Sequence, residues 1–368
     1  MGKKEKADII AKICNDILLH NKQAAVPELS GADWDEVLEM ASSQGILPIV
    51  IQKLNEANPS GGTPMVKEQL LQWIGVTLQN EQNYKLRLYV MRELAAIFGK
   101  EGIDIMFLKG ASLAQMYPNP EWRVFSDVDY YLFGDSEKGI KLLAENGIEN
   151  SEYYHHHTQA SFNGVLIENH YDFVERINHK CDVILDDALK ELAAREGHAV
   201  KAEFLGEDLK NAYLMTPTMN AIFLMRHMSA HFVSETVPLR MLYDWALFLK
   251  KYAREVDWNY VLPLYEKSGM MKFVGIIMTI LKNHLEFECQ ASPVSLGSQG
   301  MADRVWESII NPPKPDPYDK FTLKYYLFEA RTFFANRWKH KLVYPGESFV
   351  GLFFKYVKLG VSMMIKRH

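Results

Sequence analysis

Apolar positions in the first quarter of the chain recur every three or four residues, as in amphipathic helices. This spacing runs from Ile9 to Leu19, starts again near Ser30, and continues through a long segment that ends near Gly99. Ser30 belongs to the short polar residues that cap the free amides at a helix start. The pattern predicts that residues 1–95 form an N-terminal helical region.

The pattern changes at residue 103 to short apolar runs of the length and composition of buried strands. The expected strands are residues 103–108, 124–133, 158–162 and 165–174. The last two flank Asn163-Gly164, the dipeptide most typical of a tight hairpin turn. Short helices are expected over residues 110–117 and 136–145. We therefore expect a small mixed sheet within a core of residues 96–205.

Helical periodicity returns from about residue 186 to the end of the chain. Thr216-Pro217 supplies a cap residue followed by proline at the first helical position. Amphipathic segments follow at residues 221–232, 239–252 and 269–285. Residues 206–368 are thus expected to form a C-terminal helical region. The predicted class is α+β, with a small mixed-sheet core between N- and C-terminal helical regions.

The amino-acid composition limits the classes of protein to which this chain can belong. Apolar residues make up 48% and charged residues 24%, which is ordinary for a soluble globular protein. The net charge of −5 gives no broad basic field, so nucleic-acid binding is not favoured. Three widely separated cysteines indicate a reducing compartment. The N-terminus lacks the apolar core of a signal peptide, and a cytoplasmic location is expected.

The C-terminal segment, residues 349–368, is strongly apolar and interrupted by lysines. Two interpretations remain open. The segment is either a last helix packed on the body of the protein or an amphipathic helix that lies on an anionic membrane surface.

Two aspartates stand two positions apart in the predicted strand 124–133. Strand side chains alternate between faces, so Asp127 and Asp129 project from the same face. Carboxylates so placed suit Mg²⁺ or Mn²⁺, and a pair of such ions can clamp the oxygens of a phosphoryl transfer. Glu168 is the best candidate for a third carboxylate, with His170 on its face and Asp172 beyond. Alternatively, Asp127 and Asp129 are a structural pair at a strand end that is bound by solvent or by Arg123.

A lysine and a glycine precede the aspartates at the end of the first predicted strand. Gly110 lets the backbone approach a ligand closely, and the helix expected after it would present free amides to an anion. Lys109 and Arg123 would neutralise phosphates, since arginine binds phosphate through two parallel hydrogen bonds. Together these residues describe an anion site next to a metal site.

In this order the motifs resemble the DNA polymerase β-type nucleotidyltransferase superfamily, and more narrowly a bacterial family of uncharacterised nucleotidyltransferases. The resemblance covers about residues 33–285. It is carried by Leu108-Lys109-Gly110, Tyr117-Pro118, Arg123, Asp127-Val128-Asp129, Glu168-Asn169-His170, LMRHMSAHF and LRMLYDWALFL. The glycine motif departs from the usual pattern, because Gly110-Ala111-Ser112 stands where superfamily members have Gly-Ser or Gly-Gly.

The resemblance implies transfer of a nucleoside monophosphate from a nucleoside triphosphate (NTP) to an acceptor hydroxyl, with release of pyrophosphate. It assigns Asp127, Asp129 and Glu168 to the metal ions, with Glu168 also available to accept the proton of the acceptor. Lys109, Gly110, Ser112 and Arg123 would contact the nucleotide phosphates, and His170 and Asp172 would support the acceptor side. A small molecule, a glycan or a protein is the expected acceptor.

Two other interpretations of the protein's function remain open. The protein could keep the fold but only bind a nucleotide or a partner, or it could work at a membrane surface through residues 349–368. Several other side chains are assigned structural roles. These are His227 and His231 as packed or capping residues, Arg240 and Asp244 as a surface or interdomain pair, and Tyr130 and Tyr131 as packed residues. Of the run His155–His157, one histidine is expected at the edge of the site.

Overall fold

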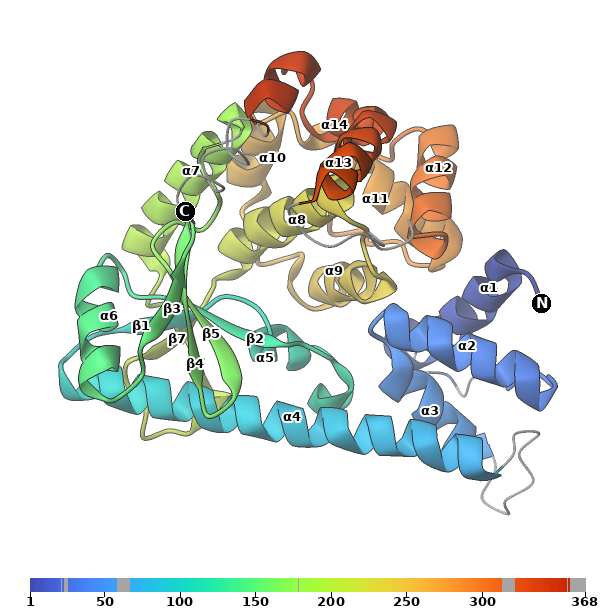
Figure 1. The fold of residues 1–368 in the computed structure, drawn as a ribbon, viewed down its shortest axis with the longest axis horizontal. Helices are drawn as coiled ribbons and strands as arrows, with labels where there is room; N and C mark the ends of the chain where they lie inside the picture. The colour runs from blue at the N-terminus through green and yellow to red at the C-terminus, as the bar shows by residue number, and fades with distance from the viewer. Residues whose placement is uncertain are drawn as a thin grey trace.

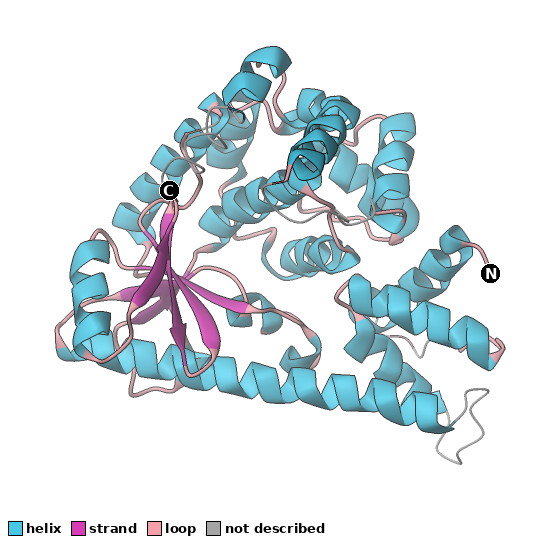
Figure 2. Cartoon of the chain, in the orientation of Figure 1, coloured by secondary structure: helices cyan, strands magenta, loops and turns pink. Residues whose placement is uncertain are grey.

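The computed structural model of the chain describes residues 1–20, 22, 26–57, 67–177, 179–312, 322–355 and 357. Helices dominate these residues, and the strands join in one mixed sheet (Figures 1 and 2). The α+β class predicted from the sequence is confirmed. No helix in the described ranges is long and apolar enough to cross a membrane.

The sheet has seven strands among the described residues, in the order β3-β4-β5-β2-β1-β7-β6. Their bounds are β1 Ile105–Phe107, β2 Asp127–Tyr131, β3 Asn150–Tyr153, β4 His157–Phe162, β5 Val165–His170, β6 Val200–Lys201 and β7 Ala212–Leu214. The hairpin predicted at Asn163-Gly164 joins β4 to β5, and both turn residues have positive φ, 51° and 76°. β2 pairs in parallel with β5, and this pairing sets the site.

The long helix α4 (Lys67–Lys100) covers one face of the sheet together with α6 (Ser136–Glu145) (Figure 1). Val128 and Tyr130 of β2 are buried in the core that α4 shares with the strands. Because neighbouring strand residues point to opposite faces, Asp127 and Asp129 project from the face away from α4. The expected boundary at residue 95 falls inside α4, so the helix belongs to both the N-terminal region and the core.

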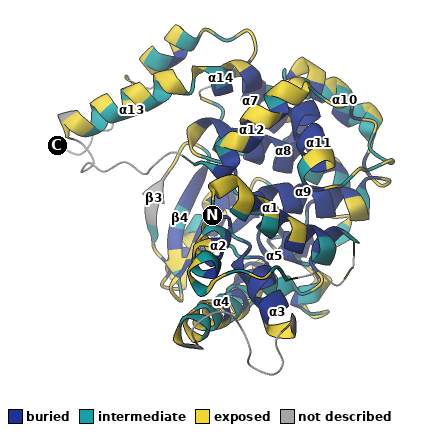
Figure 3. Cartoon of the chain, turned by 90° about the vertical axis from the view of Figure 1, so that its right-hand side faces the viewer, coloured by how far each residue is buried: buried dark blue, intermediate teal, exposed yellow. Residues whose placement is uncertain are grey.

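The helical body lies on the other side of the sheet. It begins with α7 (Lys180–Glu196), between β5 and β6. The helices that follow β7 are α8 Pro217–Ser234, α9 Leu239–Tyr252, α10 Trp258–Lys267, α11 Met271–His284 and α12 Gln299–Ile310. Thr216 caps α8 as predicted, since its side chain accepts a hydrogen bond from the amide of Met219. Helices α8, α9 and α11 are largely buried (Figure 3). They enclose the largest core of the molecule.

The N-terminal helices pack on this helical body. They are α1 Lys3–Cys14, the π-helical turn Asn15–His20, α2 Gly31–Ser43 and α3 Leu47–Ala57. Tyr243 of α9 donates a hydrogen bond to Asn15 Oδ1 at 2.9 Å, and Lys250 donates to the carbonyl of Leu19 at 2.8 Å. The N-terminal helices thus join the helical body, and α3 also contacts α4.

The last described helices are α13 (Leu323–Ala335) and α14 (Arg337–Val343). α13 projects from the body in Figure 3. Of the predicted terminal segment, residues 349–355 and 357 are helical, and residues 356 and 358–368 lie outside the described residues. Phe334 and Phe354 expose 51% and 65% of their surface, so these apolar side chains are not packed on the body.

Candidate active site

The Lys109-Gly110 turn lies at the end of β1, and Phe125 and Arg123 contact Gly110 there. Gly110 has φ 65°, a conformation that favours glycine, and a Cβ there would lie 3.0 Å from the ring of Phe125. The Gly110 carbonyl accepts a hydrogen bond from Arg123 Nη1 at 3.0 Å. Helix α5 (Ala111–Ala114) follows, and Ser112 Oγ donates to the carbonyl of Lys109 at 3.2 Å. Ser112 therefore stabilises the turn, and its contact with phosphate remains a prediction.

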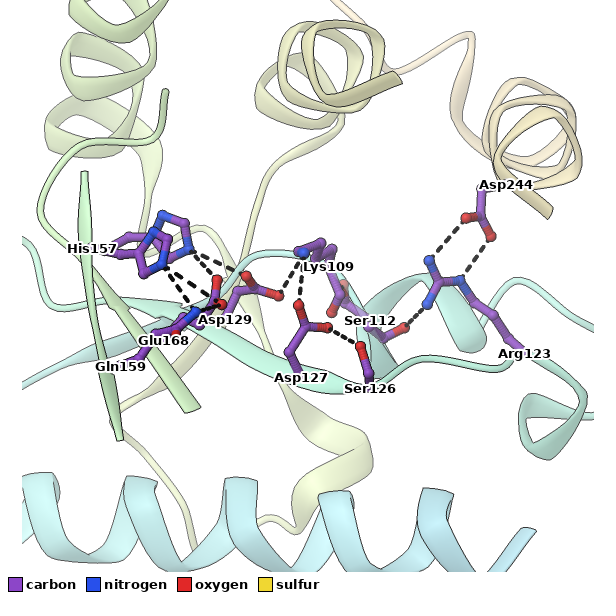
Figure 4. Close-up of polar contacts among 12 residues, drawn as sticks. Lys109, Ser112, Arg123, Ser126, Asp127, Asp129, His157, Gln159, Glu168 and Asp244 are labelled. Carbon is purple, nitrogen blue, oxygen red and sulfur yellow. Dashed lines mark hydrogen bonds and ion pairs between the residues drawn. The ribbon is translucent and has the colours of Figure 1, made fainter. Parts of the chain in front are cut away.

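The two aspartates of β2 face Lys109, as Figure 4 shows. Lys109 Nζ lies 3.2 Å from Asp127 Oδ2 and 3.2 Å from Asp129 Oδ2. Burial of Lys109 lowers its pKa, but the charges of Asp129 and Asp127 outweigh this effect, so the pKa is raised and the ammonium keeps its charge. The predicted placement of both aspartates on one face holds, and a lysine bridges them.

Glu168 completes the cluster from the neighbouring strand. The parallel register pairs Asp129 with Glu168 across β2 and β5. Glu168 Oε1 accepts a hydrogen bond from Gln159 Nε2 at 2.7 Å. Burial raises the pKa of Glu168, but hydrogen bonding to His170 and nearby positive charges dominate and lower it to about 2. Glu168 is therefore an ionised carboxylate and a weak base.

His170 connects the two buried carboxylates. Its Nε2 lies 3.2 Å from Asp129 Oδ1 and 3.6 Å from Glu168 Oε2, while Nδ1 lies 3.3 Å from the carbonyl of Asp172. Burial lowers the pKa of His170, yet hydrogen bonds to Asp129 and Glu168 prevail and raise it to about 9. His170 is thus an imidazolium at neutral pH, with both ring N–H groups donating.

The residues fit a divalent cation. Ligand oxygens of Asp129 and Glu168 lie within 4.8 Å of each other, and the His170 ring, equally close, would first have to lose a proton to act as a ligand itself. Oδ2 of Asp129 is buried and, among the described residues, accepts no hydrogen bond, although Lys109 stands near it. A buried carboxylate oxygen without a hydrogen bond is a suitable ligand for Mg²⁺ or Mn²⁺. The assignment of the metal to Asp127, Asp129 and Glu168 remains a prediction.

Histidines form a second group at the edge of this cluster. Ring nitrogens of His156, His157 and His170 also come within 4.8 Å of one another. His157 is buried, and its Nε2 lies 3.7 Å from Glu168 Oε1. His155 is exposed. His157 accordingly reaches Glu168, and His156 lies beside it close to His170.

Arg123 does not present a free guanidinium. Its Nε and Nη2 donate to Asp244 Oδ1 and Oδ2 of α9 at 2.7 and 2.8 Å, and its Nη1 is used on Gly110. The expectation that Arg123 is a main phosphate ligand therefore needs correction, because its Nε, Nη1 and Nη2 each already donate to protein and its side chain is only 3% exposed. Arg240, expected to pair with Asp244, approaches it only to 3.9 Å. Arg123 and Asp244 instead join the sheet core to the helical body.

Asp172 and the strand tyrosines stand apart from the cluster. The carboxylate of Asp172 pairs with Lys190 of α7, so the structure does not bring it to the aspartates. Tyr130 is fully buried on the α4 side, and Tyr131 packs on Phe173 with ring centroids 4.4 Å apart. The packing role predicted for both tyrosines agrees with the structure.

A cavity of about 140 Å³ opens beside the cluster, between the Lys109-Gly110 turn and helices α8 and α9. Asp127 and Ser126 line it from the sheet. His227, His231 and Arg240 line it from the helices. The sequence assigned these last residues structural roles, although His227 and His231, four apart on one helix, share a face. In the sequence, this four-residue spacing was a feature that could have indicated that His227 and His231 line a site.

The fold and this cluster define an α+β protein with a carboxylate and lysine site on its mixed sheet and with helical extensions. The narrower assignment comes from the comparison with protein families. The family described as uncharacterised nucleotidyltransferase matches residues 30–286, more than half of the chain. The chain belongs to this family, and the resemblance drawn from the sequence motifs is confirmed. Comparisons with curated proteins and with solved structures each found no significant match.

Proposed function

We propose that this protein transfers a nucleoside monophosphate from an NTP to a hydroxyl group of an acceptor. In this reaction the acceptor oxygen bonds to the α-phosphorus, and the bond from the α-phosphorus to the α,β-bridging oxygen breaks. Pyrophosphate leaves, and the hydroxyl proton passes to a base. One observation carries the proposal: three carboxylates from two paired strands, with Lys109, gather beside a glycine turn in a chain of this family.

The roles of the residues follow from their surroundings. Asp127, Asp129 and Glu168 would hold Mg²⁺ or Mn²⁺, which when bound supplies charge stabilisation to the attacking and leaving oxygens. With a pKa of about 2, Glu168 is better suited to hold a cation than to accept a proton near neutral pH. His170 orients Asp129 and Glu168. Lys109 shares the same carboxylates, so cation binding competes with it and makes its ammonium available to phosphate oxygens.

The acceptor is proposed to be a small molecule, a glycan or a protein. The acidic net charge of −5 gives no general attraction for a nucleic-acid backbone. We place the reaction in the cytoplasm, because the three cysteines Cys14, Cys181 and Cys289 are free thiols.

Transfer of label from the α-phosphate tests the function. The protein is incubated with each NTP carrying label on the α-phosphate, with Mg²⁺ or Mn²⁺ and fractionated metabolites, glycans or proteins as acceptors. The expected result is one labelled product together with released pyrophosphate, lost in Asp129→Asn. The matched control is Asp135→Asn, the same change at an exposed residue outside the site. Equal transfer by Asp129→Asn and the wild type would contradict the assignment.

A non-catalytic binding protein is the second candidate, and the position of Lys109 favours it. An ammonium 3.2 Å from both aspartates can balance their charge in the way a metal ion would. This candidate predicts that an NTP binds without metal and without pyrophosphate release. Nucleotide binding that requires Mg²⁺ or Mn²⁺ would exclude it.

Contact with a membrane surface is supported by the exposed aromatic side chains Phe334 and Phe354. If the acceptor is lipid-linked, these residues and the terminal segment would bring the site to it. Sedimentation with anionic vesicles, with and without residues 349–368, measures this contact. Equal sedimentation of both chains would exclude a role for the segment.

A further inference from the structure

The cavity beside the carboxylates has room for more than water. Its volume is about 140 Å³. One water needs roughly 10–15 Å³ by this kind of measure, so a ligand group of several non-hydrogen atoms fits. Lys109 and Asp127 lie on the cavity wall and also belong to the carboxylate cluster. A group bound in the cavity is therefore a neighbour of the proposed metal ions.

Arg240 brings to this cavity a positive charge whose carboxylate partner, Asp244, is shared with Arg123. Its side chain is 22% exposed, and among the described residues its nearest carboxylate is Asp244 at 3.9 Å. Asp244 is already bound by two nitrogens of Arg123 and by the hydroxyl of Tyr117 at 2.9 Å. A largely buried guanidinium is costly unless an anion compensates it. An anionic ligand would supply that compensation.

The surroundings of Arg240 keep its side chain at the cavity wall. Gly45, with φ 70°, packs against it so closely that a Cβ would lie 3.1 Å from Nε. His227 and His231 line the same wall. Burial and the charge of Lys109 lower the pKa of both histidines, so each is neutral at neutral pH and offers one ring N–H. The wall thus presents hydrogen-bond donors.

We propose that Arg240 is the main ligand of an oxyanion subsite that receives phosphate oxygens, with His227 and His231 as supporting donors. A guanidinium binds such oxygens through two parallel hydrogen bonds. Two sources share this chemistry: the β- and γ-phosphates of the NTP, and a phosphate group on the acceptor. The identity of the source rests on the proposed function, whereas the subsite itself does not.

Calorimetric titration with inorganic pyrophosphate in EDTA tests the subsite without metal or turnover. We expect wild type to bind pyrophosphate and Arg240→Gln to bind it roughly ten- to a hundredfold more weakly, as for loss of a charge-assisted pair. Arg240→Lys keeps the charge but not the fork and should fall between them. Arg92→Gln is the matched control, because Arg92 pairs with exposed Asp208 and lies outside the cavity.

A second variant and a folding control show that weaker pyrophosphate binding does not come from a misfolded protein. His227→Leu removes a donor from the other helix and should weaken binding roughly two- to tenfold. Thermal unfolding of each unliganded variant establishes that it is folded. No binding of pyrophosphate to wild type, or equal binding by Arg240→Gln and Arg92→Gln, would overturn the proposal.

A titration with NTP and the matching nucleoside monophosphate, both with Mg²⁺, separates the two sources. If the subsite holds the β- and γ-phosphates, Arg240→Gln weakens NTP binding and leaves monophosphate binding unchanged. If it holds a phosphate of the acceptor, Arg240→Gln weakens pyrophosphate binding alone. Asp129→Asn should still bind pyrophosphate in EDTA, so failure of the transferase assay and failure of the subsite are distinguishable.

Discussion

The Arg123–Asp244 pair should be a main contributor to stability between the sheet core and the helical body. Only 3% of the Arg123 side chain and 6% of the Asp244 side chain are exposed. Asp244→Ala leaves the Arg123 guanidinium buried without its counter-ion and removes the acceptor of the Tyr117 hydroxyl. Removing one partner of a buried pair costs about 3–5 kcal/mol. We expect the free energy of unfolding to fall by that amount.

A double-mutant cycle measures the pair itself. Urea unfolding is followed by far-UV circular dichroism and by tryptophan fluorescence for Arg123→Met, Asp244→Leu and the double variant. Because the double variant leaves neither Arg123 nor Asp244 as a buried charge without the other, it should be more stable than the sum of the single losses by about 2–4 kcal/mol. The exposed Arg92–Asp208 pair is the control and should show a coupling below about 1 kcal/mol. Additive losses at Arg123 and Asp244 would refute the reasoning.

Three further predictions concern the site and the solvent. Glu168→Gln should abolish the metal-dependent stabilisation by NTP, whereas Gln159→Ala should only weaken it. Calorimetry with Mn²⁺ measures both effects, and equal effects of the two variants would contradict the ligand role of Glu168. Gly110→Ala should destabilise by about 1–3 kcal/mol in urea unfolding, because φ is 65° and the ring of Phe125 is 3.0 Å from the added carbon; an unchanged midpoint would refute this. Burial lowers the pKa of His340 from 6.5 to about 4. The unfolded chain therefore takes up the proton first, and the free energy of unfolding falls as pH drops from 6.5 to 4. His340→Asn should reduce the slope of stability against pH in this range, and an unchanged slope would contradict the prediction.

Features set by neighbouring residues could be predicted from the sequence. The Asn163-Gly164 turn, the cap at Thr216 and the common face of Asp127 and Asp129 each depend on a few consecutive positions. The approach of Glu168 to Asp129 also followed from alternation along each strand, once the two strands were taken as neighbours.

Features set by distant pairing could not be predicted. Strand β6 has two residues and β7 three, and β7 exists because it pairs in parallel with β1. The core therefore continues past residue 205, where the sequence placed its boundary. Arg123 meets Asp244 across 121 positions, and no local pattern reports such a contact. The sequence consequently assigned Arg123 to phosphate and paired Asp244 only with Arg240, which lies 3.9 Å from it.

The most direct test of the central claim is the thermal stability of wild type and Asp129→Asn with each NTP, with and without Mg²⁺ or Mn²⁺. A ligand that binds only the folded chain stabilises it by about 2.7 kcal/mol at a hundredfold excess over its dissociation constant. We predict a metal-dependent rise of the unfolding temperature with at least one NTP, absent in Asp129→Asn and retained in Asp135→Asn. No rise with any nucleotide, or the same rise in Asp129→Asn, would contradict the account.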